Sequence, residues 1–237
     1  MFKRHDLVWL TRAGWQAALA ADPAREAVFS YWQREEWPAV VRRCEPDAGP
    51  GMNAGSAGNV ASGGPTMAPV QQEVCLGIAL PPDADGLKQR IGLRAVLAHV
   101  ERTSSPLTLK AARPALPAHW RPGYTELQRL STGLDLRVFG SLAWQALTGL
   151  PCLGAGSDID ILFRPVSQQQ LRAGLALLAG AGHGLPLDGE IMFPSGQAVS
   201  WKEWNAAGAA KARVLVKEIG GVQLADPEAL LATLRPA

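Results

Sequence analysis

Residues 138–163 decide the fold, and they read Val-Phe-Gly-Ser-Leu-Ala-Trp-Gln-Ala-Leu-Thr-Gly-Leu-Pro-Cys-Leu-Gly-Ala-Gly-Ser-Asp-Ile-Asp-Ile-Leu-Phe. A short apolar run breaks at Gly140-Ser141, and the helix-forming stretch that follows, residues 142–148, stops at Gly149. In the last part, two acids alternate with apolar residues at the period of a strand. The pattern predicts a strand, a tight turn, a helix and a second strand, in that order.

Asp158 and Asp160 form the acidic half of a candidate site. Successive side chains of a strand point to opposite faces, so the two aspartates share one face, with Cα atoms roughly 6.5–7 Å apart. Ile159 and Ile161 point the other way, toward a core. Two carboxylates held side by side repel each other unless a cation lies between them, and Mg²⁺ favours one or two carboxylates together with substrate phosphates. We therefore expect Asp158 and Asp160 to be catalytic and to bind a divalent metal, Mg²⁺.

The Gly140-Ser141 turn supplies the complementary half of that site. Gly140 lets a phosphate approach the backbone closely, and Ser141 stands at the start of a helix, where free N–H groups favour anions. Either motif alone is commonly a solvated edge or a plain turn, whereas their conjunction favours a metal–phosphate site. Gly140, Ser141 and the nearby Ser157 are therefore expected to bind the phosphates of a substrate.

A third carboxylate is expected from the next predicted strand, residues 185–193. Asp188 and Glu190 lie two residues apart and therefore on one face of it. Glu190 is nearer the middle of the strand, where rigidity favours accurate placement, so we favour it over Asp188 as a catalytic base. A merely solvated role for the pair stays open. Three residues remain candidates for the cation that pairs with a phosphate, Lys202, Arg164 and Lys217.

The composition is that of a globular protein without a pervasive charge bias. The 237 residues are 47% hydrophobic and 19% charged, with a formal net charge of +2, which fits about two modest domains. Charge alone does not indicate nucleic-acid binding, no run of about 18 apolar residues predicts a membrane span, and the N-terminus lacks a signal-peptide core. We expect a cytoplasmic protein. Cys44, Cys75 and Cys152 are odd in number and widely separated, so they are interpreted as reduced thiols that form neither a disulfide nor a zinc site.

Strands interleaved with helices and hairpins predict an α+β, or mixed α/β, fold. A smaller N-terminal α+β domain is expected over residues 1–102, with a flexible loop at residues 45–70, where small and polar residues replace large apolar ones. Residues 103–123 are rich in Pro, Ser and Arg and are interpreted as a linker. Residues 124–237 are then expected to form the catalytic domain.

The motifs resemble those of the nucleotidyltransferase superfamily, in which Gly-Ser follows a first strand and Asp-x-Asp lies on a second. The gap between Ser141 and Asp158 is longer than most members show. A longer stretch of sequence is more specific: it reads Gly-Ser-Leu-Ala-Trp-Gln-Ala-Leu-Thr-Gly-Leu and then Ser-Asp-Ile-Asp-Ile-Leu. This sequence is similar to that of the phosphoribosyl-dephospho-CoA transferases, the holo-acyl-carrier-protein synthases of malonate decarboxylase. Residues 4–10 and 188–204 add to the likeness, which reaches nearly end to end and is thinner over residues 45–72.

This resemblance implies a nucleotidyltransferase-like catalytic domain and a specific reaction. A serine of the apo acyl carrier protein subunit of malonate decarboxylase would attack the α-phosphate of 2′-(5″-triphosphoribosyl)-3′-dephospho-CoA, and pyrophosphate would leave. The expected partners are that carrier subunit and that substrate, with no nucleic acid and no membrane. Two other classes remain, another nucleotidyltransferase that uses ATP or CTP and a non-catalytic nucleotide-binding module. The near-neutral charge counts against an RNA substrate, and the intact acidic motif counts against the binding module.

Overall fold

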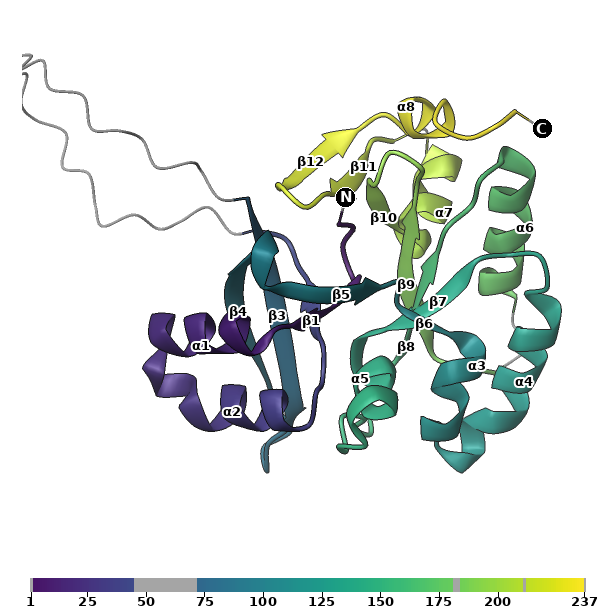
Figure 1. Cartoon of the computed structure of the whole chain (residues 1–237). Helices are drawn as coiled ribbons and strands as arrows, with labels where there is room; N and C mark the ends of the chain where they lie inside the picture. The colour runs from purple at the N-terminus through teal and green to yellow at the C-terminus, as the bar shows by residue number, and fades with distance from the viewer. Residues whose placement is uncertain (1, 45–71, 181–183, 211, 237) are drawn as a thin grey trace, which may run out of the picture.

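Residues 2–44, 72–180, 184–210 and 212–236 are described by the structure, a computed structural model, and they form two sheets accompanied by helices (Figure 1). This mixture of helices and strands confirms the predicted α+β class. The loop predicted at 45–70 lies outside the described residues. Within the described ranges, no helix is long and apolar enough to cross a membrane.

The first sheet has five antiparallel strands in the order β4-β3-β2-β1-β5. Helices α1 and α2 follow β1 in the chain and cover one face of the sheet (Figure 1). The bounds are β1 (Leu7–Leu10), α1 (Arg12–Ala21), α2 (Glu26–Arg34), β2 (Ala39–Val41), β3 (Glu73–Pro82), β4 (Lys88–Val96) and β5 (Val100–Ser104).

The core of this first domain lies between its helices and its sheet. Thr11 begins α1 as predicted, because its hydroxyl accepts a hydrogen bond from the Gly14 N–H at 3.1 Å. Trp15, Phe29 and Trp32 from the two helices are buried in one cluster with apolar residues of the strands. Burying side chains of this size stabilises the small domain strongly.

The second sheet has seven strands in the order β12-β11-β10-β9-β8-β7-β6. Only β8 and β9 pair in parallel, and all other neighbours in this described sheet are antiparallel. Its strands are β6 (Leu107–Thr108), β7 (Leu136–Phe139), β8 (Ile159–Phe163), β9 (Leu187–Met192), β10 (Ala198–Ser200), β11 (Val214–Lys217) and β12 (Val222–Ala225). Its helices are α3 (Leu109–Ala112), α4 (Arg121–Leu130), α5 (Gly140–Thr148), α6 (Gln168–Ala179), α7 (Trp201–Ala210) and α8 (Pro227–Leu231).

The two faces of β8 serve different purposes. Ile159, Ile161 and Phe163 are fully buried in the large core between the sheet and its helices, as the alternating pattern predicts. Leu162 belongs to a separate small cluster on the opposite face. Asp160 alternates with the core residues, so it faces away from that core and lines a cavity together with residues of β3 and β4 from the first domain.

Helix α5 connects the two cores. Leu142 is buried in the core of the second domain, whereas Trp144 is buried in the core of the first, with its ring centroid 6.1 Å from that of Trp32. The helix ends at Gly149, which adopts the left-handed conformation with φ of +71°. The predicted helix and its stop are therefore confirmed, and the helix fixes the two domains against each other.

The predicted linker at residues 103–123 is instead largely part of the second domain. Strand β6 pairs with β7, and α3 follows it directly. Leu109, Leu116 and Trp120 are buried in the core of the second domain. The many Pro and Arg residues of the segment suggested a linker. The segment nevertheless packs against the second domain through these few, widely spaced apolar residues.

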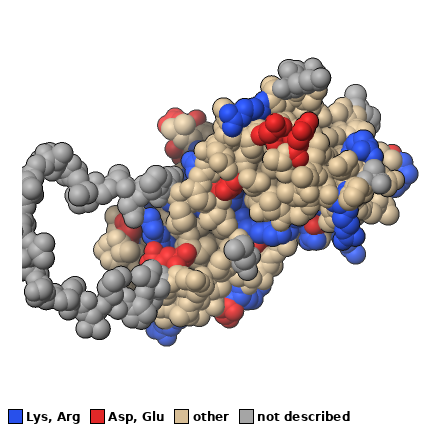
Figure 2. All heavy atoms as spheres, turned by 90° about the horizontal axis from the view of Figure 1, so that it is seen from above, with Lys and Arg blue, Asp and Glu red and all other residues tan. Residues whose placement is uncertain are grey.

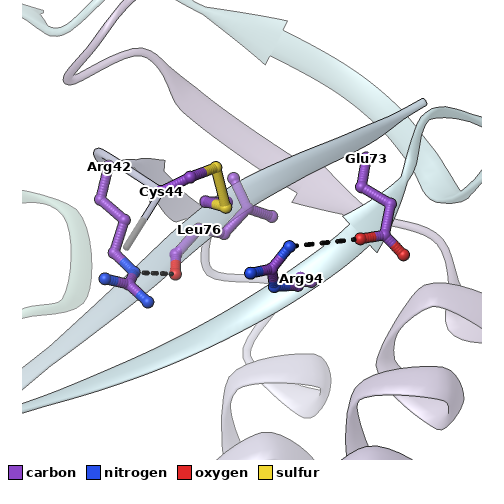
Figure 3. The surroundings of a disulfide bond; sticks show 6 residues. Arg42, Cys44, Glu73, Leu76 and Arg94 are labelled. Carbon is purple, nitrogen blue, oxygen red and sulfur yellow. Dashed lines mark hydrogen bonds and ion pairs between the residues drawn. A yellow bond between two sulfur atoms is a disulfide. The ribbon is translucent and has the colours of Figure 1, made fainter. Parts of the chain in front are cut away.

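Two of the cysteines form a disulfide, so their interpretation as reduced thiols is wrong. Cys44 and Cys75 are bonded, although they are 31 residues apart in sequence (Figure 3). The antiparallel pairing of β2 with β3 sets Val41 opposite Leu76. This pairing brings the Cα atoms of Cys44 and Cys75 to 5.3 Å from each other. Spacing in the sequence could not reveal a contact made by strand pairing. Cys152 is free and buried.

Candidate active site

The Gly-Ser turn lies against the second aspartate. Gly140 begins α5 with φ of +67°, and a Cβ atom at this position would collide with the carboxylate of Asp160. The residue at the N-cap, Phe139, provides no side-chain hydrogen bond to the first turn. The helix start therefore offers backbone N–H groups and the positive end of the helix dipole to an anion, as predicted.

The two aspartates lie close to that helix start. Strand β8 begins at Ile159, so Asp158 lies one residue before the strand rather than within it, and its side chain is exposed. Asp160 is partly buried, and burial, the charge of Asp188 and the charge of Asp158 raise its pKa from 3.8 to about 6. A carboxylate whose ionised form is this unfavourable would be stabilised by a bound cation.

The aspartates and the Gly-Ser turn open into one cavity of about 220 Å³. Its walls come from both domains, with β3 and β4 on one side and α5, β8 and the loop before β8 on the other. The lining residues that carry the argument are Lys88, Arg90, Ser141, Ser157, Asp158 and Asp160. The structure thus brings Gly140, Ser141, Ser157 and both aspartates together as predicted.

Lys88 and Arg90 are site residues that the sequence analysis missed. The Nζ atom of Lys88 donates to Ser141 Oγ at 2.7 Å and to Ser157 Oγ at 3.2 Å. The charges of Lys88 and Arg90 also oppose the rise in the pKa of Asp160. Their spacing of two residues on a strand, which gives them one shared face, is the signal that could have drawn attention to them.

Asp188 lies beside the acidic pair. The parallel register of β8 and β9 sets Asp160 opposite Asp188, and Asp188 is the largest charge contribution to the raised pKa of Asp160. Its Oδ1 atom is 3.3 Å from Lys202 Nζ, and the two side chains are 41% and 53% exposed. Lys202 therefore pairs with the third carboxylate and does not line the cavity.

Glu190 lies in a different environment, which does not suit a base. It is buried, and its carboxylate lies 3.3 Å from Arg4 Nη2, 3.1 Å from His5 Nε2 and 2.8 Å from Lys217 Nζ. Burial would raise the pKa of Glu190, but the hydrogen bond with His5 and the nearby positive charges outweigh it and hold the pKa well below its usual range. A carboxylate held in its ionised form accepts a proton poorly, so the geometry reverses our preference for Glu190 over Asp188.

The Glu190 cluster also ties the N-terminal segment to the second sheet. Burial lowers the pKa of His5, and its ring lies 4.0 Å from the ring of Phe139, the residue before Gly140. Next to it, Asp6 Oδ1 accepts a hydrogen bond from Arg164 Nη2 at 3.3 Å. Two of the predicted phosphate-binding cations are thus engaged within the protein: Arg164 contacts Asp6 of the first domain, and Lys217 pairs with Glu190 inside the second sheet.

The donor set fits Mg²⁺ as a metal shared with a substrate. Among the described residues, no group of three His, Cys, Asp or Glu side chains is arranged to hold a metal ion by itself. Mg²⁺ is commonly held by one or two carboxylates together with substrate phosphates, so an incomplete protein site is compatible with it. The raised pKa of Asp160 is consistent with a place for such a cation.

Charges of both signs are interspersed on the face shown in Figure 2. A protein that binds nucleic acid commonly gathers Lys and Arg on one broad face. The face in Figure 2 does not show such a gathering of one sign.

Comparisons with known proteins identify the family. The chain matches the models of the phosphoribosyl-dephospho-CoA transferase MdcG N-terminal domain over residues 3–63 and of the MdcG C-terminal domain over residues 108–228. A phosphoribosyl-dephospho-CoA transferase of Xanthomonas euvesicatoria pv. vesicatoria is 38% identical over 242 residues, which cover 100% of both chains. The same-named protein of Bradyrhizobium diazoefficiens is 36% identical over 94% of this chain and 89% of its own. No solved structure matches. The chain belongs to the phosphoribosyl-dephospho-CoA transferase family.

Proposed function

We propose that this protein is a phosphoribosyl-dephospho-CoA transferase that modifies the apo acyl carrier protein subunit of malonate decarboxylase. The activity in the name of its relatives supports the transferase assignment. The carrier subunit as acceptor and 2′-(5″-triphosphoribosyl)-3′-dephospho-CoA as donor are what the resemblance to the holo-acyl-carrier-protein synthases of malonate decarboxylase implies.

In the proposed reaction, the Oγ atom of a carrier serine forms a bond to the α-phosphorus of the donor. The bond from that phosphorus to the oxygen bridging to the β-phosphate breaks, and pyrophosphate leaves with the electron pair. The serine proton passes to a base. Asp188 is the proposed base because it lies next to Asp160 in register and is solvent-accessible, whereas Glu190 is held by cations.

Asp158 and Asp160 are the proposed ligands of Mg²⁺. When bound, the ion would neutralise charge on the phosphates of the donor. The protein's own contribution is to hold the donor: the absence of a Cβ at Gly140 leaves room for the Asp160 carboxylate beside the turn, and the first turn of α5 offers N–H groups to the phosphates. The observation that carries the proposal is the contact of the Gly140 turn with Asp160. It places a helix start that can bind phosphates directly beside the carboxylates of Asp158 and Asp160.

A mass-spectrometric assay tests this function. The purified protein is incubated with apo carrier subunit, triphosphoribosyl-dephospho-CoA and Mg²⁺, and the intact mass of the carrier is followed together with released pyrophosphate. We expect one adduct per carrier and an equal amount of pyrophosphate, with no adduct on a carrier whose acceptor serine is replaced by alanine. An unmodified carrier, or transfer of a nucleotide from ATP or CTP in its place, would overturn the proposal.

A further inference from the structure

Strand β4 of the first domain sends two cations into the active-site cavity. Lys88 and Arg90 are two residues apart, share one face of the strand and both line the cavity. Lys88 contacts Ser141 at the start of α5 and Ser157 directly before the aspartates. The first domain therefore contributes directly to the site that the motifs place in the second.

Neither of these cations forms an ion pair within the described part of the chain, although the charges of both act on Asp160. Within the described part of the chain, the Nζ atom of Lys88 hydrogen-bonds to hydroxyl groups and forms no ion pair. The guanidinium of Arg90 has neither a hydrogen bond nor an ion pair with any described residue. An ammonium group at the positive end of α5 is opposite to the charge that a helix start favours. A negatively charged group between Lys88, Arg90 and the helix start would relieve this arrangement.

Negative and positive side chains line opposite sides of the cavity. Asp158 and Asp160 lie on the side of the second domain, whereas Lys88 and Arg90 lie on the side of the first. A polyphosphate chain matches this division, because it can share a metal with the aspartates and present its remaining oxygens to the cations. The hydroxyls of Ser141 and Ser157 hold Lys88 in position before such a ligand binds.

We propose that Lys88 and Arg90 bind the departing β- and γ-phosphates of the donor, so that the first domain forms the pyrophosphate-binding wall of the active site. This inference rests on the proposed function for the identity of the donor. Its chemistry, a polyphosphate held between a cationic strand and an acidic strand, can be tested without that donor.

Binding of inorganic tripolyphosphate in the presence of Mg²⁺, measured by isothermal titration calorimetry, is the first test. Replacing Lys88 or Arg90 with alanine is expected to weaken binding by about tenfold or more, the scale of a lost charge-assisted hydrogen bond. Lys110→Ala is the matched control, because Lys110 is an exposed lysine of α3 that does not line the cavity. It is expected to bind like the parent. Equal affinity of the parent and the Lys88→Ala and Arg90→Ala variants, or no binding by the parent, would overturn the proposal.

The transfer assay separates this inference from the proposed function. We expect Lys88→Ala to raise KM for triphosphoribosyl-dephospho-CoA by about tenfold, with the thermal melt of the parent retained. A parent that transfers the group, beside a Lys88→Ala variant with unchanged KM and tripolyphosphate affinity, would refute the role of Lys88 and leave the function standing. A parent that binds tripolyphosphate through Lys88 and transfers nothing would refute the function and leave the phosphate-binding wall standing.

Discussion

Asp160 and Glu190 are carboxylates on neighbouring parallel strands, and their surroundings shift them in opposite directions. Asp160 is partly buried beside Asp188 and Asp158, and burial together with these two charges raises its pKa to about 6. Glu190 lies beside Arg4, His5 and Lys217, and its pKa falls well below the usual range. In the register of β8 with β9, Asp160 lies opposite Asp188 and Leu162 lies opposite Glu190. The same pair of strands therefore contains both the carboxylate with a raised pKa and the carboxylate with a lowered one.

This difference separates the acids that we propose as reactive from a glutamate that joins the domains. In the acidic cluster, burial and the neighbouring carboxylates outweigh the charges of Lys88 and Arg90 at Asp160, so the cluster suits a further cation that comes from solution or with a substrate. A glutamate already surrounded by cations is satisfied within the protein, and removing it would leave those charges unpaired. We therefore assign chemistry to the acidic cluster and domain attachment to Glu190.

The largest effect is expected at Asp160. Asp160→Asn should lower the transfer rate by about 10³-fold, because a preorganised charged group at the phosphates is lost while the fold is kept. Transfer is followed by carrier mass, and melts followed by circular dichroism check the fold. Substantial turnover by this variant would end the assignment of the acidic cluster as the active site.

The same variant carries a pH prediction. Since the pKa of Asp160 rises on folding from 3.8 to about 6, the metal-free folded state binds its proton more tightly than the unfolded state does. The parent should therefore lose stability relative to Asp160→Asn as the pH rises through this interval, and the loss should level off above it. A constant difference between the two melts across this interval would show that Asp160 is not perturbed.

Glu190→Gln is expected to act mainly on stability. It should lower the free energy of unfolding by about 3 kcal/mol, the low end for breaking a buried ion pair, because Arg4 and Lys217 lose their counter-charge. Because the pKa of Glu190 is lowered in the folded state, this contribution is present above the ordinary glutamate pKa of 4.5 and is lost as the pH falls below it. Urea denaturation above and below that pH measures it. Parent-like stability combined with a kcat lowered about 10²-fold would instead identify Glu190 as the base.

In contrast to Glu190→Gln, Asp188→Asn is expected to act on the transfer rate rather than on stability. We expect kcat to fall by about 10²-fold through loss of the proton acceptor. Stability should change little, since Asp188 is 41% exposed and pairs with an exposed lysine. Asp135→Asn is the matched control, because Asp135 is 39% exposed and pairs with Arg137. Normal turnover by Asp188→Asn would remove Asp188 from the mechanism.

The smallest expected effect is the difference in stability between alanine substitutions at Gly140 and at Gly149. Both have positive φ, +67° and +71°, so alanine should cost about 1–2 kcal/mol at either position from backbone strain alone. A Cβ at Gly149 meets nothing within 4 Å, whereas one at Gly140 meets the Asp160 carboxylate. Gly140→Ala should therefore be the less stable variant in thermal melts, and only it should also lose transfer activity. Equal effects of the two substitutions would show that the turn and the acidic cluster are independent.

Local pattern predicted the second domain well. The alternation around Ile159 and Ile161, the turn at Gly140 and the helix stop at Gly149 are confirmed, because each depends on a few adjacent residues. Strand β12 was not predicted, since its side chains are mostly exposed and lack an alternating apolar signal.

Contacts between distant segments could not be predicted in this way. Lys88 reaches Ser141 across 53 residues, and Arg4 reaches Glu190 across 186. The Cys44–Cys75 bond likewise depends on the pairing of β2 with β3. Each of these contacts follows from how the two sheets are assembled, which no local spacing encodes, and so the preference between Asp188 and Glu190 needed the structure.

The proposal that the acidic cluster binds a divalent cation is tested by titrating the Asp160 carboxylate. Carbon-13 NMR of aspartate-labelled protein, with the signal assigned from Asp160→Asn, gives its pKa with and without Mg²⁺. We expect a pKa of about 6 for Asp160 without metal, lowered by more than about one unit when Mg²⁺ binds. A pKa near 3.8 that Mg²⁺ leaves unchanged would contradict it.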